Sequence, residues 1–268
     1  MSIKIGVTLH PQHMTAPEYL KAWQRADTIG VDSIWNWDHF FPLSGDPNGA
    51  AFEGWTVLAA CGMRTQRTQI GNLVLSMPYR NPALLSTMAR TLDHLTGGRL
   101  VLGLGAGWFE RDYREYGFEL GTPAERLRQL EAGIHMVKQR WSQDEPKPLR
   151  GSIPLLIGGS GEKVTLRIVA EHADLWHCFG SPSEWSRKNR VLDEWCMRLG
   201  RRPGDIEQIA SIADESSEAP IRDMRPHYET LDAYVASGAE HILYGWAVPF
   251  DFGPVEDLLE WRARRGSV

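Results

Sequence analysis

The pair Asp38-His39 carries the clearest acid–base chemistry in the sequence, because it directly follows the largely apolar run 34–37. A histidine has an ordinary pKa near neutrality, so His39 can donate or accept a proton, and Asp38 can orient a partner or hold charge. Adjacent side chains on a strand point to opposite faces, so the two need not touch. A histidine that only caps the loop backbone is the open alternative.

Two glycine-rich segments also follow apolar runs. Residues 158–161 (GGSG) join a predicted strand to a predicted helix. Glycines there let backbone N–H groups approach an anion, and the helix N-terminus adds positive partial charge. Residues 103–107 (GLGAG) end another predicted strand, and their small side chains would let a flat ring approach the backbone. For both segments a tight turn that requires glycine is the open alternative.

The remaining candidate groups are histidines and cysteines. His10, His13 and His177 follow apolar runs and are interpreted as structural or substrate-wall residues. No pair of histidines has the i, i+4 spacing of a helical zinc site, so we expect no metal. The three cysteines are widely spaced, which indicates neither a disulfide framework nor a zinc knuckle. No nucleophile elbow or reactive-cysteine pattern is present, which argues against acyl-transfer hydrolysis.

Short apolar runs alternate with amphipathic stretches, which predicts strands and helices in turn. The predicted strands are 3–8, 33–37, 69–75, 100–104, 154–157, 174–177, 206–212 and 241–244. The first predicted helix lies between a helix-capping residue at position 15 and Gly30. The other predicted helices cover 55–63, 82–95, 123–141, 164–172, 184–199, 222–236 and 255–264. Eight such units fit a closed (β/α)8 TIM barrel, a single domain over 1–268, better than an open sheet. In such a barrel the chemistry belongs on the loops after the strands.

Composition narrows the class of protein further. The chain has 268 residues, and 29 Lys+Arg against 34 Asp+Glu give a formal net charge of −5, which argues against a broad nucleic-acid surface. No stretch approaches the roughly 18 apolar residues of a membrane span, and the first residues lack a secretory pattern, so we expect a cytoplasmic enzyme. The 11 tryptophans favour a large apolar pocket as well as a core.

An ordered set of motifs resembles the bacterial luciferase-like oxidoreductases, particularly the branch that uses the 8-hydroxy-5-deazaflavin coenzyme F420. The motifs are 38–40 (DHF), 53–56 (EGWT), 71–74 (GNLV), 79–82 (YRNP), 92–93 (LD), 97–100 (GGRL), 103–108 (GLGAGW), 115–118 (EYGF), 125–127 (ERL) and 154–159 (PLLIGG). The resemblance covers about residues 1–180 well and the remainder poorly.

The resemblance implies a luciferase-like barrel with the coenzyme ring in its mouth and the coenzyme phosphate on the amides of 158–161. It implies a non-prolyl cis peptide at Leu73-Val74 behind the ring, and it gives His39 the role of proton donor or acceptor. The residues that it assigns to the coenzyme are Asp38, Leu73, Val74, Ala106, Gly107, Trp108, Gly158, Gly159, Ser160 and Gly161.

The expected substrate is a small, apolar organic molecule. The sugar-phosphate branch of the family uses basic residues in its last third, whereas this chain has no lysine after Lys188. The predicted substrate-binding residues are His10, Trp37, Trp176 and His177. We therefore expect hydride transfer between coenzyme F420 and this substrate. The alternatives are a reduced-FMN-dependent monooxygenase and a non-catalytic flavin- or deazaflavin-binding barrel. Family analogy suggests a homodimer.

Overall fold

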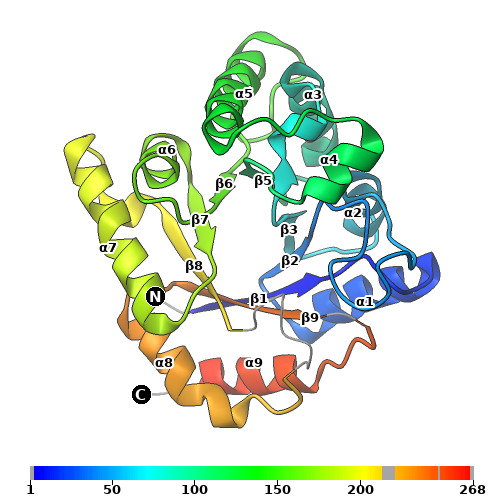
Figure 1. The fold of residues 1–268 in the computed structure, drawn as a ribbon. Helices are drawn as coiled ribbons and strands as arrows, with labels where there is room; N and C mark the ends of the chain where they lie inside the picture. The colour runs from blue at the N-terminus through cyan, green and yellow to red at the C-terminus, as the bar shows by residue number, and fades with distance from the viewer. Residues whose placement is uncertain (1–2, 213–220, 247, 266–268) are drawn as a thin grey trace.

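The structure, a computed structural model, describes residues 3–212, 221–246 and 248–265, so the outermost ends of the domain predicted over 1–268 lie outside the described residues. Strands alternate with helices along the chain (Figure 1). The strands are β1 (Lys4–Leu9), β2 (Ser33–Asn36), β3 (Gln69–Asn72), β4 (Leu75–Ser76), β5 (Leu100–Gly105), β6 (Leu155–Gly158), β7 (Leu175–Cys178), β8 (Glu207–Ser211) and β9 (His241–Trp246). The α-helices are α1 (Ala16–Ile29), α2 (Gly54–Gly62), α3 (Pro82–Leu95), α4 (Glu110–Tyr116), α5 (Pro123–Gln143), α6 (Thr165–His172), α7 (Pro182–Arg198), α8 (Tyr228–Ala236) and α9 (Gly253–Arg265).

The strands pair in parallel and close into a barrel. Their order is β3-β2-β1-β9-β8-β7-β6-β5-β4, and an additional pairing of β3 with β5 closes the ring. Both β3 and β4 pair with β5, so they are two halves of one barrel strand, interrupted by residues 73–74. In the described part of the chain the sheet therefore has eight barrel positions. The predicted (β/α)8 barrel is confirmed.

Two apolar layers hold the barrel together. A small inner cluster fills the barrel and consists of Trp35, Leu73, Val101, Leu156, Leu175, Ile209 and Leu243. A much larger cluster lies between the strands and the surrounding helices, and it includes Ile34, Trp176 and Trp185. Successive side chains on a strand point to opposite faces, so Ile34 and Trp35 belong to different layers.

Local sequence signals explain several helix ends. Thr15 begins α1, Thr122 begins α5 and Ser181 begins α7, each through a capping box with a glutamate three residues later and a proline in the first turn. These side chains satisfy backbone N–H groups that have no partner inside the helix. Gly30 ends α1 with φ 103°, a left-handed conformation that glycine adopts at little cost.

The predictions were wrong in three places. The predicted strand 69–75 is two strands, because the chain bulges at residues 73–74. The helix α4 was not predicted, since it has only 7 residues and follows a glycine-rich segment that reads as a loop. The predicted helix 222–236 begins only at Tyr228, after a 3-10 turn over Arg225–His227.

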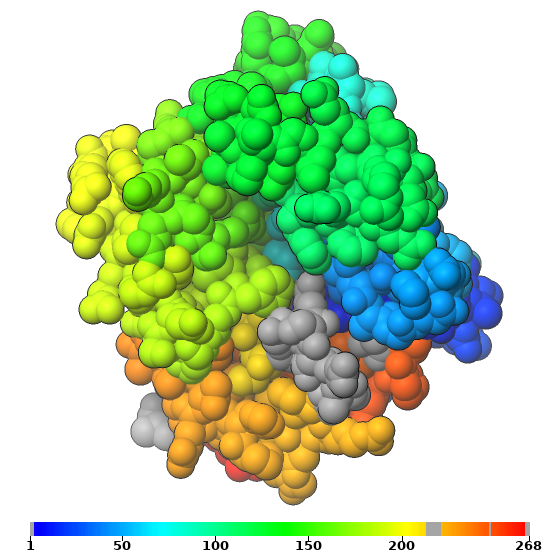
Figure 2. Space-filling view, viewed as in Figure 1, coloured from blue at the N-terminus to red at the C-terminus, as the bar shows by residue number. Residues whose placement is uncertain are grey.

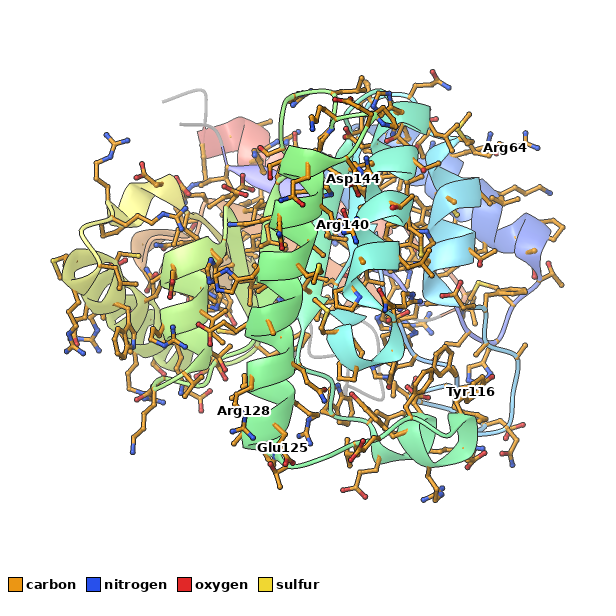
Figure 3. The ribbon with its side chains drawn as sticks, turned by 90° about the horizontal axis from the view of Figure 1, so that it is seen from above. Arg64, Tyr116, Glu125, Arg128, Arg140 and Asp144 are labelled. Atoms are coloured by element: carbon orange, nitrogen blue, oxygen red, sulfur yellow. The ribbon has the colours of Figure 1, made fainter. Side chains whose placement is uncertain are left out.

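Figure 3 shows which end of the barrel carries the loops after the strands. Glu125 at the start of α5 lies at the same end of the molecule as Tyr116, and Asp144 after α5 lies at the opposite end with Arg64. The helix thus runs back from the carboxyl end of β5, as a βα unit requires. Among the described residues, no helix combines the length and the apolar character needed to cross a membrane.

Candidate active site

A cavity of about 370 Å³ opens at the carboxyl ends of the barrel strands. Figure 2 shows this face hollowed near its centre, between surfaces coloured green and yellow-green. The cavity is lined by Trp37, Asp38, His39, Leu73, Val74, Ser76, Tyr79, Gly105, Ala106, Gly107, Trp108, Leu127, Leu130, Gly158, Gly159, Ser160, Thr165, His177, Cys178 and Phe179. The segments after β2, β4, β5, β6 and β7 therefore meet around one cavity, whereas the loop after β1 contributes no lining residue.

His39 is held at the cavity by a buried carboxylate that the sequence did not reveal. Its Nδ1 atom lies 2.8 Å from Oδ2 of Asp112, which is fully buried on α4. The hydroxyl of Tyr79 donates to the same oxygen at 3.0 Å, and the backbone N–H of Phe40 donates to Oδ1 at 3.1 Å. The imidazole packs edge-on against Trp108, with 5.5 Å between ring centroids. The His39 side chain is therefore held in one orientation by Asp112 and Trp108, and it remains 15% exposed.

Asp38 lines the cavity but its carboxylate is engaged by Arg80. The guanidinium donates to both carboxylate oxygens, at 2.6 and 2.7 Å, and the N–H of Ser76 donates to Oδ2 at 3.0 Å. Burial raises the pKa of the Asp38 carboxyl, and the Arg80 charge opposes this shift. Arg80 also contacts Glu53, so three charged side chains from separate segments join at the rim. The coenzyme contact predicted for Asp38 has only the remaining acceptor position of Oδ1 available to it.

Glycines keep one wall of the cavity thin. The peptide bond Leu73–Val74 is cis, as the resemblance implied. A Cβ atom on Gly105 would lie 2.5 Å from a methyl group of Val74, and one on Gly158 would lie 3.0 Å from the other. Gly107, with φ +77°, leaves room for the hydroxyl of Tyr113, which a Cβ atom would meet at 1.8 Å. Side chains at Gly105 and Gly158 would fill the space beside Val74, and one at Gly107 would collide with Tyr113.

The loop after β6 presents backbone donors ahead of α6, which begins at Thr165. The N–H of Gly159 donates a hydrogen bond to the carbonyl of His177 at 3.0 Å. Within the described residues, the N–H groups of Ser160 and Gly161 have no acceptor, and α6 begins without a side-chain cap. Free backbone N–H groups in a glycine-rich loop that leads into a helix suit an anion. Ser160 lines the cavity, whereas Gly161 lies beyond its wall.

The predicted substrate residues occupy three different places. His177 and Trp37 line the cavity, and His177 Nε2 lies 2.8 Å from the hydroxyl of Ser211. His10 stacks on Trp37 with 4.0 Å between centroids, but it is only 3% exposed and lies behind the lining. Neither of its ring nitrogens has a hydrogen-bond partner in the described part of the chain. Burial lowers the pKa of each histidine to about 3, so both rings are neutral at physiological pH.

Trp176 does not fit the predicted substrate contact. It is fully buried in the outer apolar layer and stacks on Trp185 of α7, with 5.6 Å between centroids. Its neighbour His177 takes the inward position, because the two alternate along β7. The indole Nε1 donates to the carbonyl of Gly159 at 2.8 Å. Trp176 therefore supports the loop 158–161 from behind.

Comparison with known proteins places the chain in a family. The model of the luciferase-like monooxygenase family matches residues 1–261, and the chain belongs to this family. The resemblance predicted from the ordered motifs is confirmed at that level.

Similar proteins have related descriptions. The chain is 31% identical over 179 residues to a Mycobacterium tuberculosis protein named as a coenzyme F420-dependent oxidoreductase, a match to 56% of this chain and 50% of the relative. It is 30% identical over 144 residues to an F420-dependent glucose-6-phosphate dehydrogenase of Amycolatopsis mediterranei, a match to 53% of this chain and 43% of the relative. The matches thus span about half the length of these relatives. The fold is shared with a solved F420-dependent secondary alcohol dehydrogenase in complex with an F420-acetone adduct, with a TM-score of 0.83 and 18% identity. The match covers 97% of this chain and 98% of that structure.

Proposed function

We propose that the chain is a coenzyme F420-dependent oxidoreductase that transfers a hydride between the deazaflavin and a small, apolar organic substrate. The observation that carries this proposal is the His39–Asp112 pair, which faces the same cavity as the glycine-thinned wall at Val74. The names of the similar proteins support the choice of coenzyme, and the common fold supports its site.

The cavity residues fit a flat ring with an attached phosphate. Leu73 and Val74 would back the ring, while Ala106, Gly107 and Trp108 would flank it. The amides of Ser160 and Gly161, together with the start of α6, would receive the phosphate. When bound, the deazaflavin supplies a ring carbon that gives or accepts a hydride and reacts poorly with oxygen.

His39 would manage the proton that accompanies hydride transfer. An ionised Asp112 can only accept hydrogen bonds, so it fixes the tautomer with hydrogen on Nδ1 of His39. Nε2 is then the atom that accepts a proton from an alcohol, or donates one to a carbonyl oxygen when the ring is charged. Trp108 and Phe109 pack edge-on against the imidazole and help to hold its orientation.

The cavity walls favour an apolar substrate over a phosphorylated one. Trp37, Leu127 and Phe179 supply apolar surface, and no lysine or arginine is among the described residues that line the cavity. A sugar phosphate, such as the one named for the Amycolatopsis relative, would bring about two negative charges without a lining cation to pair with them. We therefore expect small alcohols or ketones to be better substrates.

Titration of the purified protein with each coenzyme tests this proposal. We expect coenzyme F420 to bind at least tenfold more tightly than FMN, a difference of about 1.4 kcal/mol, and to be reduced or oxidised in the presence of secondary alcohols or ketones. Gly105→Val, which would place a branched side chain against Val74, should abolish binding while circular dichroism shows a folded barrel. Preference for FMN with oxygen consumption would instead indicate a monooxygenase. Binding without turnover would indicate a non-catalytic carrier.

We also propose that the chain forms a homodimer, on the family analogy alone. Light scattering coupled to size-exclusion chromatography should give twice the chain mass of 30.3 kDa. A mass of 30.3 kDa at micromolar concentration would contradict the dimer.

A further inference from the structure

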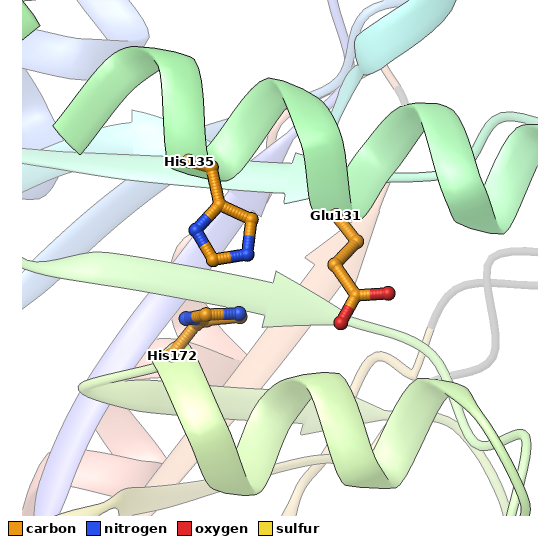
Figure 4. Close-up of side chains that lie close together, drawn as sticks. All are labelled: Glu131, His135 and His172. Carbon is orange, nitrogen blue, oxygen red and sulfur yellow. The ribbon is translucent and has the colours of Figure 1, made fainter. Parts of the chain in front are cut away.

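Three potential metal ligands meet on the outside of the barrel, away from the cavity. Glu131 and His135 lie one turn apart on α5, and His172 is the last residue of α6. One ligand atom from each lies within 4.8 Å of the other two. Figure 4 shows both imidazoles and the carboxylate directed into the space between the two helices. Residues at i and i+4 share a helix face, so Glu131 and His135 approach His172 together.

His172 has an unsatisfied polar atom at this place. Its side chain is 8% exposed, and its Nε2 atom is buried with no hydrogen-bond partner among the residues that the structure describes. The nearest carboxylate oxygen of Glu171 is 3.8 Å away, beyond hydrogen-bond distance. Buried polar atoms are rarely left unpaired, so an unpaired nitrogen directed at two other ligands calls for a partner.

We propose that Glu131, His135 and His172 bind a divalent transition-metal ion, for which Zn²⁺ is the best match. Two imidazole nitrogens and one carboxylate oxygen form a common three-ligand zinc set, and imidazole favours zinc, nickel and copper over magnesium or calcium. Ligand atoms around zinc lie about 3.4 Å apart when the bonds are about 2.1 Å. The exposed His135 can close this gap by rotating its side chain.

The charged groups around the three ligands affect how tightly the site would bind a metal ion. Arg167 donates to both oxygens of Glu131, at 2.8 and 2.9 Å, and also to Glu171 at 2.9 Å. Each Glu131 oxygen keeps a second lone pair, and a hydrogen bond to a ligating carboxylate orients it. The Lys138 ammonium binds the carbonyl of His172 at 2.9 Å. The two cations weaken the attraction for a metal, so we expect a single moderate-affinity site.

Zinc titration of the untagged protein against a chelating indicator tests the proposal. We expect one Zn²⁺ per chain in the wild type and at least tenfold weaker binding in His135→Ala and in Glu131→Gln. His135 is exposed, so its removal leaves the core intact. The matched control is His94→Ala, which removes an exposed histidine from the last turn of α3 and should bind Zn²⁺ as the wild type does.

Thermal unfolding gives an independent measurement. A metal that joins α5 to α6 binds only the folded state, so saturating Zn²⁺ should raise the Tm of the wild type but not that of His135→Ala. Absence of stoichiometric binding in the wild type, or equal binding in the wild type and His135→Ala, would overturn the proposal. Neither measurement involves the coenzyme, so the outcome is separate from that of the proposed activity.

Discussion

Asp112 Oδ2 and His39 Nδ1 lie 2.8 Å apart, although 73 residues separate them in the sequence. His39 comes from the loop after β2, and Asp112 comes from α4, which follows β5. The carboxylate is fully buried and receives hydrogen bonds from three donors. It is therefore fixed more firmly than the imidazole that it orients, which is the arrangement expected of a positioning residue.

Replacing Asp112 by asparagine should reduce turnover with little change in coenzyme affinity. The amide can present N–H instead of an acceptor to Nδ1, which would move the ring hydrogen to Nε2. We expect a loss of kcat of about 10²–10⁴-fold in Asp112→Asn and a similar loss in His39→Ala. Coenzyme titration should show affinities within a few-fold of the wild type.

The pH profile separates positioning from a structural role. If Asp112 acts through His39, Asp112→Asn should also displace the pH dependence of kcat, and adding it to His39→Ala should cost little more. Glu110→Gln, an exposed change on the same helix, is the control and should behave as the wild type. Wild-type turnover in Asp112→Asn would leave the carboxylate a structural anchor for Phe40 and Tyr79.

Asp38→Ala should destabilise the protein, because it leaves the largely buried Arg80 without its bidentate partner. Breaking one side of a buried ion pair costs about 3–5 kcal/mol, and the remaining contact with Glu53 favours the low end. The double variant Asp38→Asn/Arg80→Met removes both charges and should recover part of the loss. Urea unfolding of the three proteins measures these differences. Equal stability of Asp38→Ala and the wild type would contradict a buried ion pair.

The barrel and the rim loops could be predicted from sequence because their signals are local. Capping threonines and prolines mark helix starts, and apolar runs mark strands that are buried on both faces. The predicted helix 82–95 agrees with α3 at both ends. Candidate rim residues such as Asp38, His39 and Ser160 follow from strand ends once a barrel is assumed, whereas Leu73 and Val74 came only from the family resemblance.

The partners of those residues could not be predicted, because they depend on how distant segments pack. The sequence around Asp112 does not distinguish it from an exposed aspartate on a short helix. The sequence around Arg80 does not indicate that Asp38 is its ion-pair partner. Trp176 was misplaced because the register of β7 decides which of two neighbours faces inward. The cluster of Glu131, His135 and His172, proposed above as a metal site, draws on two helices, so a search for histidine pairs on one helix does not find it.

Gly159→Ala should weaken coenzyme binding by distorting the loop 158–161. Gly159 has φ +131°, which an L side chain rarely adopts, and a Cβ atom would lie 3.0 Å from a methyl group of Thr165. The loop would then shift the amides of Ser160 and Gly161. We expect at least a tenfold loss of coenzyme affinity. Gly151→Ala is the matched control, since it introduces similar strain at φ +80° with nothing within 4 Å and far from the cavity. Equal affinities in both variants would place the phosphate elsewhere.

The buried neutral histidines should make stability fall between pH 7.5 and 5.5. Burial lowers the folded-state pKa of His10 and His177 from 6.5 to about 3. A lowered pKa means that the unfolded chain binds protons that the folded chain does not. The contribution of the neutral histidines to the unfolding free energy is therefore complete above pH 6.5 and is lost as the pH falls toward 3. Over the stated interval each residue should cost about 1.4 kcal/mol, and His172 adds a loss of the same sign.

Urea unfolding of the coenzyme-free protein at both pH values measures this loss. We expect a decrease of about 3 kcal/mol in the unfolding free energy of the wild type from His10 and His177 together. His10→Gln or His177→Gln should each remove about half of that pH dependence, because glutamine does not titrate. His94→Gln, at an exposed position, should leave the dependence unchanged. A flat profile in the wild type would mean that the two rings take up protons in the folded barrel as readily as in the unfolded chain, and His10 would then have to be reached by water or by a carboxylate.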